Sequence, residues 1–307
     1  MILEEIQKRT FLDIDYIRSI INRSNSLYSK FYIFKRDGSK RWIHHPKKEL
    51  KLIQRVVNDN ILDKLKIHPS STAYRRGCSV KKNALLHVNN DFLLRMDFKS
   101  FFDSISYDDI ENFLDKEFSI SEPNWTYSDT KLLAKLLCYK NSLVMGAVTS
   151  PCISNAICYK LDKKLSGLCQ NHNVIYSRYA DDLYFSTSER NTLFFIEKEV
   201  LKIVANLELP SGLTINKNKT FHSSRKRKKQ VTGLILTHDK KLSIGRNKKR
   251  TVKSKVHNWA TLNENERSYL SGYISYIHSI EPQFINRLCL KYGADLVGEI
   301  ISYNSKL

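Results

Sequence analysis

Apolar residues recur every three or four positions in several long stretches of this chain, which is the spacing of helices with one buried face. The stretches with this spacing are residues 2–21, 50–65, 110–140 with a break near Pro123, 153–168, 191–207 and 247–303. Shorter runs rich in aromatic and β-branched residues predict strands. These runs are residues 31–34, 41–43, 92–97, 176–186, 212–221, 231–236 and 242–244. The pattern predicts helices and strands mixed along one chain, with Asp37-Gly38 in the turn of a first hairpin.

Residues 176–186 carry the most informative strand pattern, Tyr-Ser-Arg-Tyr-Ala-Asp-Asp-Leu-Tyr-Phe-Ser. They predict a strand, a tight turn at Ala180-Asp181-Asp182 and a second strand. Neighbouring carboxylates point to opposite faces of a regular strand, but at a hairpin tip both can lie near one site. Burying unpaired carboxylates beside an apolar sheet costs free energy, and a bound divalent cation removes that cost. Oxygen ligands of this kind suit Mg²⁺, whereas an isolated Asp-Asp pair is usually a solvated turn.

A third carboxylate follows another apolar strand. Residues 92–97, Phe-Leu-Leu-Arg-Met-Asp, end in Asp97, and ligands often gather where the strands of a sheet end. If the sheet brings Asp97 to Asp181 and Asp182, the three carboxylates can hold two Mg²⁺ ions. Such a site activates a primer hydroxyl and stabilises the leaving pyrophosphate in an in-line displacement.

The charge of the chain points to the substrate of such a site. Among 307 residues, 51 are Lys or Arg and 31 are Asp or Glu, so the formal net charge is +20. A basic surface can be merely soluble, but with the carboxylates this excess favours nucleotidyl transfer on a nucleic acid. The six cysteines form no Cys-x-x-Cys pair, which is typical of buried thiols in a reducing compartment. The charged, amphipathic N-terminus and the lack of a long apolar run predict a cytoplasmic protein without membrane contact.

Three further segments present candidate ligands for a nucleotide or an RNA. Arg75 and Arg76 lie in a basic loop that can clamp a triphosphate or a template backbone, although a solvated loop has the same composition. A glycine loop runs into a helix at Ser150-Pro151, and the backbone near Gly146 can approach a ligand unless this is an ordinary loop-to-helix junction. Four basic residues at helical spacing can present one face to folded RNA. They are Arg246, Lys249, Arg250 and Lys253.

Seven short motifs, in order, make the chain similar to reverse transcriptases, and more narrowly to bacterial retron reverse transcriptases. They are Arg41-Trp-Ile-x-x-Pro46, Asn83-Ala-x-x-His87, Asp97-x-x-x-Phe-Phe102, Gly146-x-x-x-Ser-Pro151, Tyr179-Ala-Asp-Asp182, Gly212 to Lys219, and Val231-Thr-Gly233. Asn-Ala-x-x-His and Val-Thr-Gly are the signatures associated with retron enzymes. Where the family pattern has glutamine, this chain has Met145, which removes a polar side chain expected near the sugar of the incoming nucleotide.

The resemblance implies a role for each matched residue. Asp97, Asp181 and Asp182 would be the catalytic carboxylates that bind Mg²⁺. Phe102 would be the steric gate that excludes a ribose 2′-hydroxyl, and Lys219 would protonate the leaving pyrophosphate. Together with the loop residues Arg75 and Arg76, the nucleotide site would comprise Phe102, Met145, Gly146 and Lys219.

The implied fold is α+β, a right-hand polymerase with fingers, a palm built on an antiparallel sheet, and a helical thumb. Its parts would be N-terminal helices and fingers in residues 1–92, a palm in residues 93–235 with a fingers-like insertion around 110–150, and an RNA-binding thumb in residues 236–307. A retron enzyme of this kind uses deoxyribonucleoside triphosphates to copy part of its own structured non-coding RNA. It primes from a 2′-hydroxyl of that RNA and leaves a branched RNA–DNA molecule, the multicopy single-stranded DNA. The resemblance also implies an effector protein and a role in defence against phage.

Two other functions fit part of the pattern. The first is another bacterial reverse transcriptase, of the group II intron or abortive-infection type. The paired retron signatures and the lack of a further endonuclease, maturase or RNase H region argue against it. The second is a non-catalytic RNA-binding scaffold with a relic palm, which the presence of all three carboxylates argues against.

Overall fold

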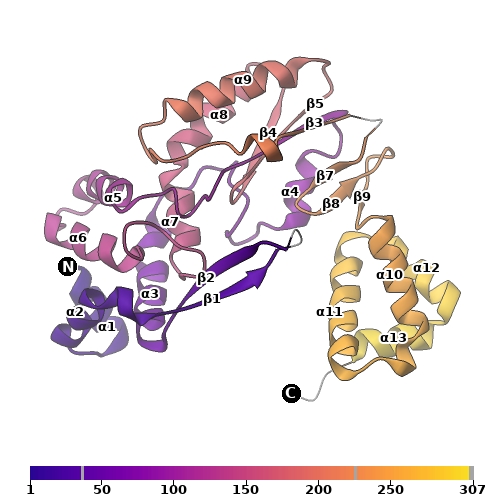
Figure 1. The fold of residues 1–307 in the computed structure, drawn as a ribbon, viewed down its shortest axis with the longest axis horizontal. Coiled ribbons are helices and arrows are strands. Elements are labelled where there is room, and N and C mark those ends of the chain that lie inside the picture. Colours follow the sequence, from indigo (N-terminus) through magenta and orange to yellow (C-terminus); the bar gives the residue numbers. More distant parts are fainter. Residues whose placement is uncertain (36–37, 225–226, 304–307) are drawn as a thin grey trace. The chain divides into compact units, whose positions relative to one another are not determined.

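The computed structural model describes residues 1–35, 38–224 and 227–303, so Asp37 of the predicted first turn lies outside the described residues. The chain divides into two compact units, whose elements are labelled in Figure 1. Unit 1 comprises Met1–Arg76, Leu94–Phe185 and Arg190–Phe221, and unit 2 comprises Gly77–Leu93, Ser186–Glu189 and His222–Leu307. None of the helices within the described residues has the length and apolar character needed to cross a membrane.

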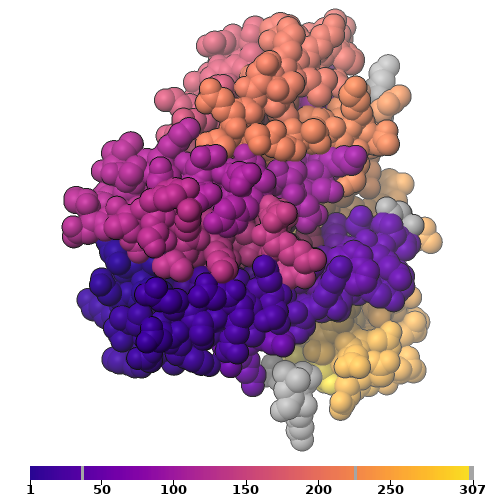
Figure 2. Space-filling model, turned by 60° about the vertical axis from the view of Figure 1, so that its left-hand side comes forward, coloured from indigo at the N-terminus to yellow at the C-terminus, as the bar shows by residue number. Residues whose placement is uncertain are grey.

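The helices in the first 137 residues of unit 1 form where the apolar spacing predicts them. They are α1 (Ile2–Thr10), α2 (Ile14–Asn22), α3 (Lys48–Asn60), α5 (Tyr107–Ser121) and α6 (Tyr127–Leu137), with short 3₁₀ turns at Ser24–Leu27 and Leu62–Lys64. Capping boxes start α5 at Ser106 and α6 at Thr126, since each hydroxyl accepts a backbone N–H that the helix leaves unpaired. Helices α1 and α2 pack on α6, so the indigo N-terminus lies against the magenta residues in Figure 2.

The central sheet has the strand order β4-β5-β3-β6. Its strands are β3 (Phe92–Asp97), β4 (Ile175–Tyr179), β5 (Asp182–Thr187) and β6 (Phe221–Ser223), and nearby lie α7 (Ser150–Ile157), α8 (Tyr159–Gln170) and α9 (Thr192–Ala205). Helices α8 and α9 run side by side, and α8 contacts β4 (Figure 1). Leu94, Met96, Leu183 and Phe185 are buried in the sheet, which ties β3 and β5 to the core. The predicted strand at residues 212–221 differs from the structure: a 3₁₀ turn at Lys217–Lys219 precedes β6.

A two-stranded ribbon stands apart from this sheet in unit 1. Strands β1 (Tyr28–Phe34) and β2 (Lys40–Pro46) pair antiparallel from Tyr28↔Pro46 to Phe34↔Lys40. Most of its residues are exposed, because the ribbon has no second layer over most of its length. The base of β2 is anchored, since the His44 amide donates to the Met145 carbonyl at 2.8 Å.

Unit 2 combines a small sheet, a short helix that precedes it in the chain, and four C-terminal helices. Strands β7 (Lys229–Val231), β8 (Leu234–Leu236) and β9 (Leu242–Ser243) pair antiparallel in that order and contact α4 (Val80–Leu86). The predicted helical region after residue 246 forms α10 (Arg246–His257), α11 (Glu264–Ile280), α12 (Pro282–Tyr292) and α13 (Ala294–Ser302), with a 3₁₀ turn at Trp259–Thr261. Pro282 suits the first turn of α12, because proline has no N–H to lose there.

Candidate active site

The end of β3 and the turn between β4 and β5 lie side by side in unit 1. The Phe98 amide donates to the Asp181 carbonyl at 3.0 Å, and the Asn216 amide donates to the Asp97 carbonyl at 2.8 Å. Ala180 has a left-handed backbone, with φ of 57°, and so turns the chain sharply before the two aspartates. The backbone therefore gathers Asp97, Asp181 and Asp182 at one end of the sheet.

The surroundings of Asp181 disfavour its ionised form. Burial raises its pKa to about 6, and repulsion from Asp182 and Asp97 adds to that effect. Among the described residues Asp181 makes no ion pair. A divalent cation would therefore stabilise its ionised form.

The other two carboxylates already have cationic partners. Lys219 places its ammonium 3.0 and 3.3 Å from the two Asp97 oxygens. Arg95 donates to Asp182 Oδ1 from Nε at 3.0 Å and from Nη2 at 2.8 Å, and the Tyr184 hydroxyl donates to Asp182 Oδ2 at 3.0 Å. Both oxygens of Asp182 are thus occupied by hydrogen bonds.

The donor set fits a hard cation, although the side chains are not arranged around one. No group of three or more His, Cys, Asp or Glu in the described parts of the chain is positioned as a metal site. The ammonium group of Lys219 lies against the Asp97 oxygens and balances their charge in place of a metal ion. Carboxylate oxygens of Asp97 and Asp181 are the ligand type that Mg²⁺ takes alongside substrate phosphates.

A cavity of about 580 Å³ opens beside Asp181. It is large enough for a nucleotide and is lined by three of the predicted nucleotide-site residues, Phe102, Met145 and Lys219. Its remaining basic lining comes from the ribbon: Lys30, Lys35, Lys40 and Arg41. Sequence reasoning missed these ribbon residues, as well as Tyr74. One indication that the ribbon contributes to the cavity was present in the sequence, because Arg41 is the first residue of the first matched motif.

The other predicted nucleotide residues do not line this cavity. Arg75 donates to the carbonyls of His68 and Ser71 at 3.2 and 3.1 Å, so its guanidinium supports its own loop. Gly146 instead makes room for β2: a Cβ at this position would lie 2.6 Å from the His44 carbonyl oxygen. Its φ of 109° is also one that side-chain-bearing residues rarely adopt. Gly146 therefore shapes the cavity through the ribbon.

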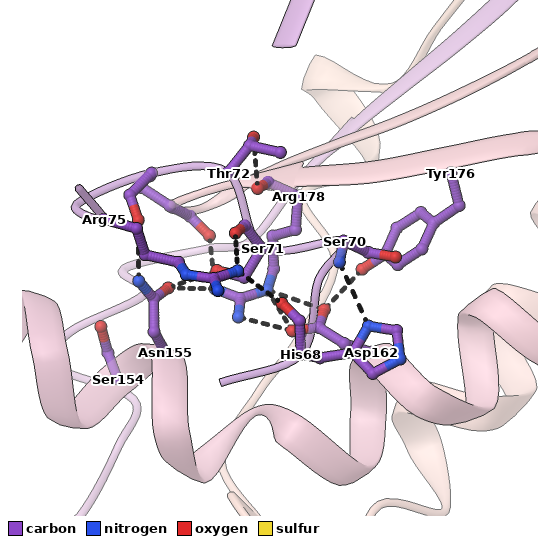
Figure 3. A network of polar contacts seen from close by, with 12 residues as sticks. His68, Ser70, Ser71, Thr72, Arg75, Ser154, Asn155, Asp162, Tyr176 and Arg178 are labelled. Carbon is purple, nitrogen blue, oxygen red and sulfur yellow. Dashed lines mark hydrogen bonds and ion pairs between the residues drawn. The ribbon is translucent and has the colours of Figure 1, made fainter. Parts of the chain in front are cut away.

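A buried polar network is centred on Arg178 and Asp162 (Figure 3). Arg178 and Asp162 are both fully buried and form a two-pronged ion pair, with Nη2–Oδ2 at 2.7 Å and Nε–Oδ1 at 2.9 Å. The Tyr176 hydroxyl also donates to Asp162 Oδ1, at 2.7 Å. The negative charge of Asp162 is thereby fully paired, as a buried charge requires.

The same network ties two walls of the site together. The Arg178 guanidinium donates to the Ala180 carbonyl at 3.2 Å, directly before Asp181, and to Asn155 Oδ1 at 3.1 Å. Asn155 in turn donates to the Ala73 carbonyl at 2.9 Å, next to the cavity residue Tyr74. Fixing these backbone groups fixes both the turn at Ala180-Asp181 and the Tyr74 loop.

The sequence of the chain aligns with known polymerases over most of its length. A family model described as reverse transcriptase (RNA-dependent DNA polymerase) matches residues 33–258. Retron Ec83 reverse transcriptase of Escherichia coli is 32% identical, over 98% of both chains. The chain belongs to the retron reverse transcriptases. Retron Ec86 reverse transcriptase of the same organism is 31% identical, covering 95% of this chain and 90% of the relative. Retron Mx162 reverse transcriptase of Myxococcus xanthus is 30% identical, covering 83% of this chain and 58% of the relative.

Membership of this family confirms the predicted activity, RNA-directed DNA polymerase, with RNA as template and deoxyribonucleoside triphosphates as substrates. Enzymes of the family generally use divalent metal ions. The right-hand α+β fold is confirmed as well. Telomerase from Candida tropicalis, solved with a TWJ fragment of telomeric RNA, has a TM-score of 0.51 at 11% identity over 90% of this chain. This chain spans 58% of the length of that telomerase.

The two retron signatures of the reverse transcriptase pack against each other in unit 2. Helix α4 contains Asn83 and contacts β7, β8 and β9, and the Thr232 hydroxyl donates to the Val80 carbonyl at 2.9 Å. His87 is fully buried, and its Nδ1 lies 2.7 Å from the Ser186 hydroxyl. Burial lowers the pKa of His87 to about 3, so its ring is neutral at physiological pH. The Asn-Ala-x-x-His and Val-Thr-Gly segments therefore pack together as one structural element of unit 2.

The predicted RNA-binding residues all lie on α10 of the same unit. Arg246 and Arg250 are exposed, whereas Val252 and Val256 of the same helix are buried. Lys249 forms an ion pair with Glu281, the residue directly before α12. This ion pair fixes the Lys249 side chain against the start of α12. The Lys249 and Lys253 ammonium groups lie 5.5 and 6.0 Å from the Phe284 ring centre.

Proposed function

We propose that this retron reverse transcriptase copies part of a dedicated structured non-coding RNA, primes from a 2′-hydroxyl of that RNA, and leaves a branched RNA–DNA molecule in the bacterial cytoplasm. The observation that carries the proposal is the nucleotide-sized basic cavity beside Asp181, in a chain with both retron signatures. We further propose, from the resemblance to retron enzymes, that the protein acts with an effector protein in defence against phage.

The proposed catalytic carboxylates are Asp97, Asp181 and Asp182, and they would hold two Mg²⁺ ions. Bound metal would activate the attacking hydroxyl and stabilise the charge that develops on the leaving oxygen. Lys219 lies against Asp97 and can give a proton to the departing pyrophosphate. Arg95 and Tyr184 hold Asp182 in a fixed orientation.

The triphosphate would bind among the cations of the cavity. Arg41 and the ribbon lysines supply charge there, which a polyphosphate needs when it leaves water. Met145 lines the cavity, and Gly146 allows the close approach of β2 that shapes it. Arg76 would reach the nucleotide from the neighbouring loop, whose shape Arg75 holds through the His68 and Ser71 carbonyls. We propose that residues 1–92 form N-terminal helices and fingers, residues 93–235 a palm with a fingers-like insertion around 110–150, and residues 236–307 an RNA-binding thumb.

The nucleic acid that copurifies with the enzyme tests this proposal. After RNase digestion we expect a DNA strand that still carries a short RNA branch. DNA without attached RNA would favour one of the other bacterial reverse transcriptases. RNA alone, with no DNA from a freshly purified active enzyme, would contradict the proposal.

Phe102→Ala is expected to admit ribonucleotides. Phe102 lines the cavity and is tilted against Phe101, with ring centres 5.5 Å apart, so its ring can clash with a ribose 2′-hydroxyl. Removing the clash should raise the ratio of ribonucleotide to deoxyribonucleotide incorporation by at least about tenfold. Single-nucleotide incorporation measures this ratio. Phe113→Ala, on α5 outside the cavity, is the matched control. An unchanged ratio in Phe102→Ala would mean that this ring only packs.

Neutralising the α10 face is expected to weaken binding of the cognate RNA and to flatten its salt dependence. Folded RNA is recognised largely through phosphates, shape and 2′-hydroxyls, which a basic helix face suits. For every RNA phosphate that the variant no longer binds, the slope of log K against log salt should fall by about 0.7–0.9. The variant replaces Arg246, Lys249, Arg250 and Lys253 with glutamine.

A control variant with the same change in net charge distinguishes binding by the α10 face from non-specific electrostatic attraction of RNA to a basic protein. It replaces four exposed lysines on helices of unit 1: Lys8, Lys116, Lys164 and Lys198. Filter binding over a salt series should show the larger loss for the α10 variant. Equal losses in both variants, or equal losses on cognate RNA and a generic primer–template, would place RNA choice elsewhere in the chain.

A further inference from the structure

A cavity of about 290 Å³ lies against α7 and α8 in unit 1. Among the described residues it shares no lining residue with the nucleotide cavity. Its apolar lining includes Ile157 at the end of α7, Tyr159 at the start of α8 and Leu209 in the loop after α9. The Tyr159 ring packs edge-on against His68, with ring centres 5.5 Å apart. A preformed apolar recess of this kind can accept one large side chain of a partner.

Four lysines surround this recess: Lys66, Lys116, Lys160 and Lys163. All four are exposed, and within the described residues none of them forms an ion pair. Glu117 is the one carboxylate in the described lining. Unpaired like charges around an apolar recess repel one another, and an acidic partner would remove that repulsion. The recess and its four lysines are called the lysine recess below.

The lysine recess continues into a neighbouring cavity of about 300 Å³ along α5. The two cavities share Lys66, Lys116 and Glu117. Ile120 lies one helical turn beyond Lys116 on the same face of α5, lines the second cavity and is 87% exposed. Covering this side chain would remove apolar surface from water. The connected cavities therefore suit an extended segment of chain better than a single small molecule.

We propose that the lysine recess binds an acidic peptide segment of a protein partner. One aromatic or large aliphatic side chain of the segment enters the recess, and carboxylates on either side of it pair with the lysines. The inference deepens the proposed function and rests on it for the protein partner, since it gives a segment of that partner a site and a chemistry.

The lining favours a peptide over a nucleic acid. A nucleic acid strand carries a phosphate at every nucleotide, so it would bring negative charge to Glu117, whereas a peptide can place an uncharged residue there. The described lining also contains no arginine, the residue that binds phosphates in a bidentate manner. The apolar recess between the lysines suits an amino-acid side chain.

Selection from displayed random peptides of about 12 residues tests the proposal without knowledge of the partner. The full-length enzyme carries its copurifying RNA during the selection, so that RNA covers the surfaces that bind it. Peptides that also bind the variant Lys160→Glu with Lys163→Glu are removed. We expect the remaining sequences to place acidic residues around one aromatic or large aliphatic residue.

Fluorescence anisotropy of the selected peptide then measures its affinity. Lys160→Glu with Lys163→Glu should raise the dissociation constant at least about tenfold, because it replaces attraction by repulsion. The matched control is Lys164→Glu with Lys198→Glu, which makes the same charge change at exposed lysines of α8 and α9 outside the recess. It should change affinity by less than about twofold. Replacing the large apolar residue of the peptide with alanine should also weaken binding at least about tenfold.

Failure to enrich any sequence would overturn the inference, and so would enriched peptides without acidic residues or an equal loss in the control variant. A labelled unstructured RNA of about 12 nucleotides is titrated in parallel. A larger loss of RNA affinity in the recess variant than in the control would assign the recess to nucleic acid and overturn the inference as well.

Failure of the proposed function is a separate result, because these assays involve no DNA synthesis. An enzyme that makes the branched product but selects no peptide keeps its polymerase function and loses this site. An enzyme that selects acidic peptides but makes no branched product keeps this site and loses the proposed function.

Discussion

Asp181→Asn is expected to abolish DNA synthesis by this retron reverse transcriptase while leaving RNA binding largely intact. Asp181 is half-buried beside Asp97 and Asp182, and its partial burial together with their repulsion raises its pKa to about 6. That excess negative charge is what a divalent cation would neutralise, so asparagine removes the reason for the cation to bind. Loss of metal-assisted stabilisation should slow extension at least about 1,000-fold.

Single-turnover extension of an annealed primer on RNA measures the effect, with filter binding as the companion assay. Asp97→Asn is expected to behave in the same way. Asp15→Asn, an exposed carboxylate on α2, is the control and should extend normally. Near-normal extension by Asp181→Asn would remove these carboxylates from the mechanism. Weakened RNA binding in step with activity would mean that the substitution disturbs the fold instead.

Arg178→Leu is expected to lower the free energy of unfolding by about 3–5 kcal/mol, because it leaves the carboxylate of Asp162 buried without its partner. Primer extension should become slower as well, because the Ala180 carbonyl and Asn155 lose the donor that positions the turn at Ala180-Asp181. Urea unfolding and primer extension measure the two effects.

Two further variants separate charge pairing from positioning. Tyr176→Phe removes one hydrogen bond to the Asp162 carboxylate but leaves its ion pair, and should cost about 1.5–3 kcal/mol. The double variant Arg178→Leu with Asp162→Leu removes both charges and should recover much of the stability, but not the activity. Full activity in the double variant would show that the network stabilises unit 1 without positioning the site. Wild-type stability of Arg178→Leu would contradict the buried ion pair itself.

Local features of the fold follow well from the sequence. Helical spacing predicts the elements of residues 2–21 and 247–303, and the capping residues Ser106 and Thr126 stand where their helices begin. The turn at Ala180-Asp181-Asp182 is predicted because aromatic residues flank two carboxylates over a short stretch. These signals are local, so no knowledge of distant contacts is needed to interpret them.

Long-range pairing is where prediction from sequence ends. Arg178 and Asp162 are 16 residues apart on different elements, and nothing in either segment shows that both are buried. Arginine is a typical phosphate ligand, yet the guanidinium of Arg75 donates hydrogen bonds to carbonyls of its own loop. The cavity residues Lys30 and Tyr74 belong to segments that only tertiary contacts bring to Asp181. Their positions depend on register and loop packing, which residue type does not encode.

The most direct test of the account is to incubate the purified complex of enzyme and copurifying RNA with labelled deoxyribonucleoside triphosphates and to resolve the products on a denaturing gel. The account predicts labelled DNA that migrates with the RNA and shifts to a smaller branched species after RNase treatment, and no label with Asp181→Asn. Labelled DNA that migrates free of RNA before RNase treatment, or label that persists with Asp181→Asn, would contradict it.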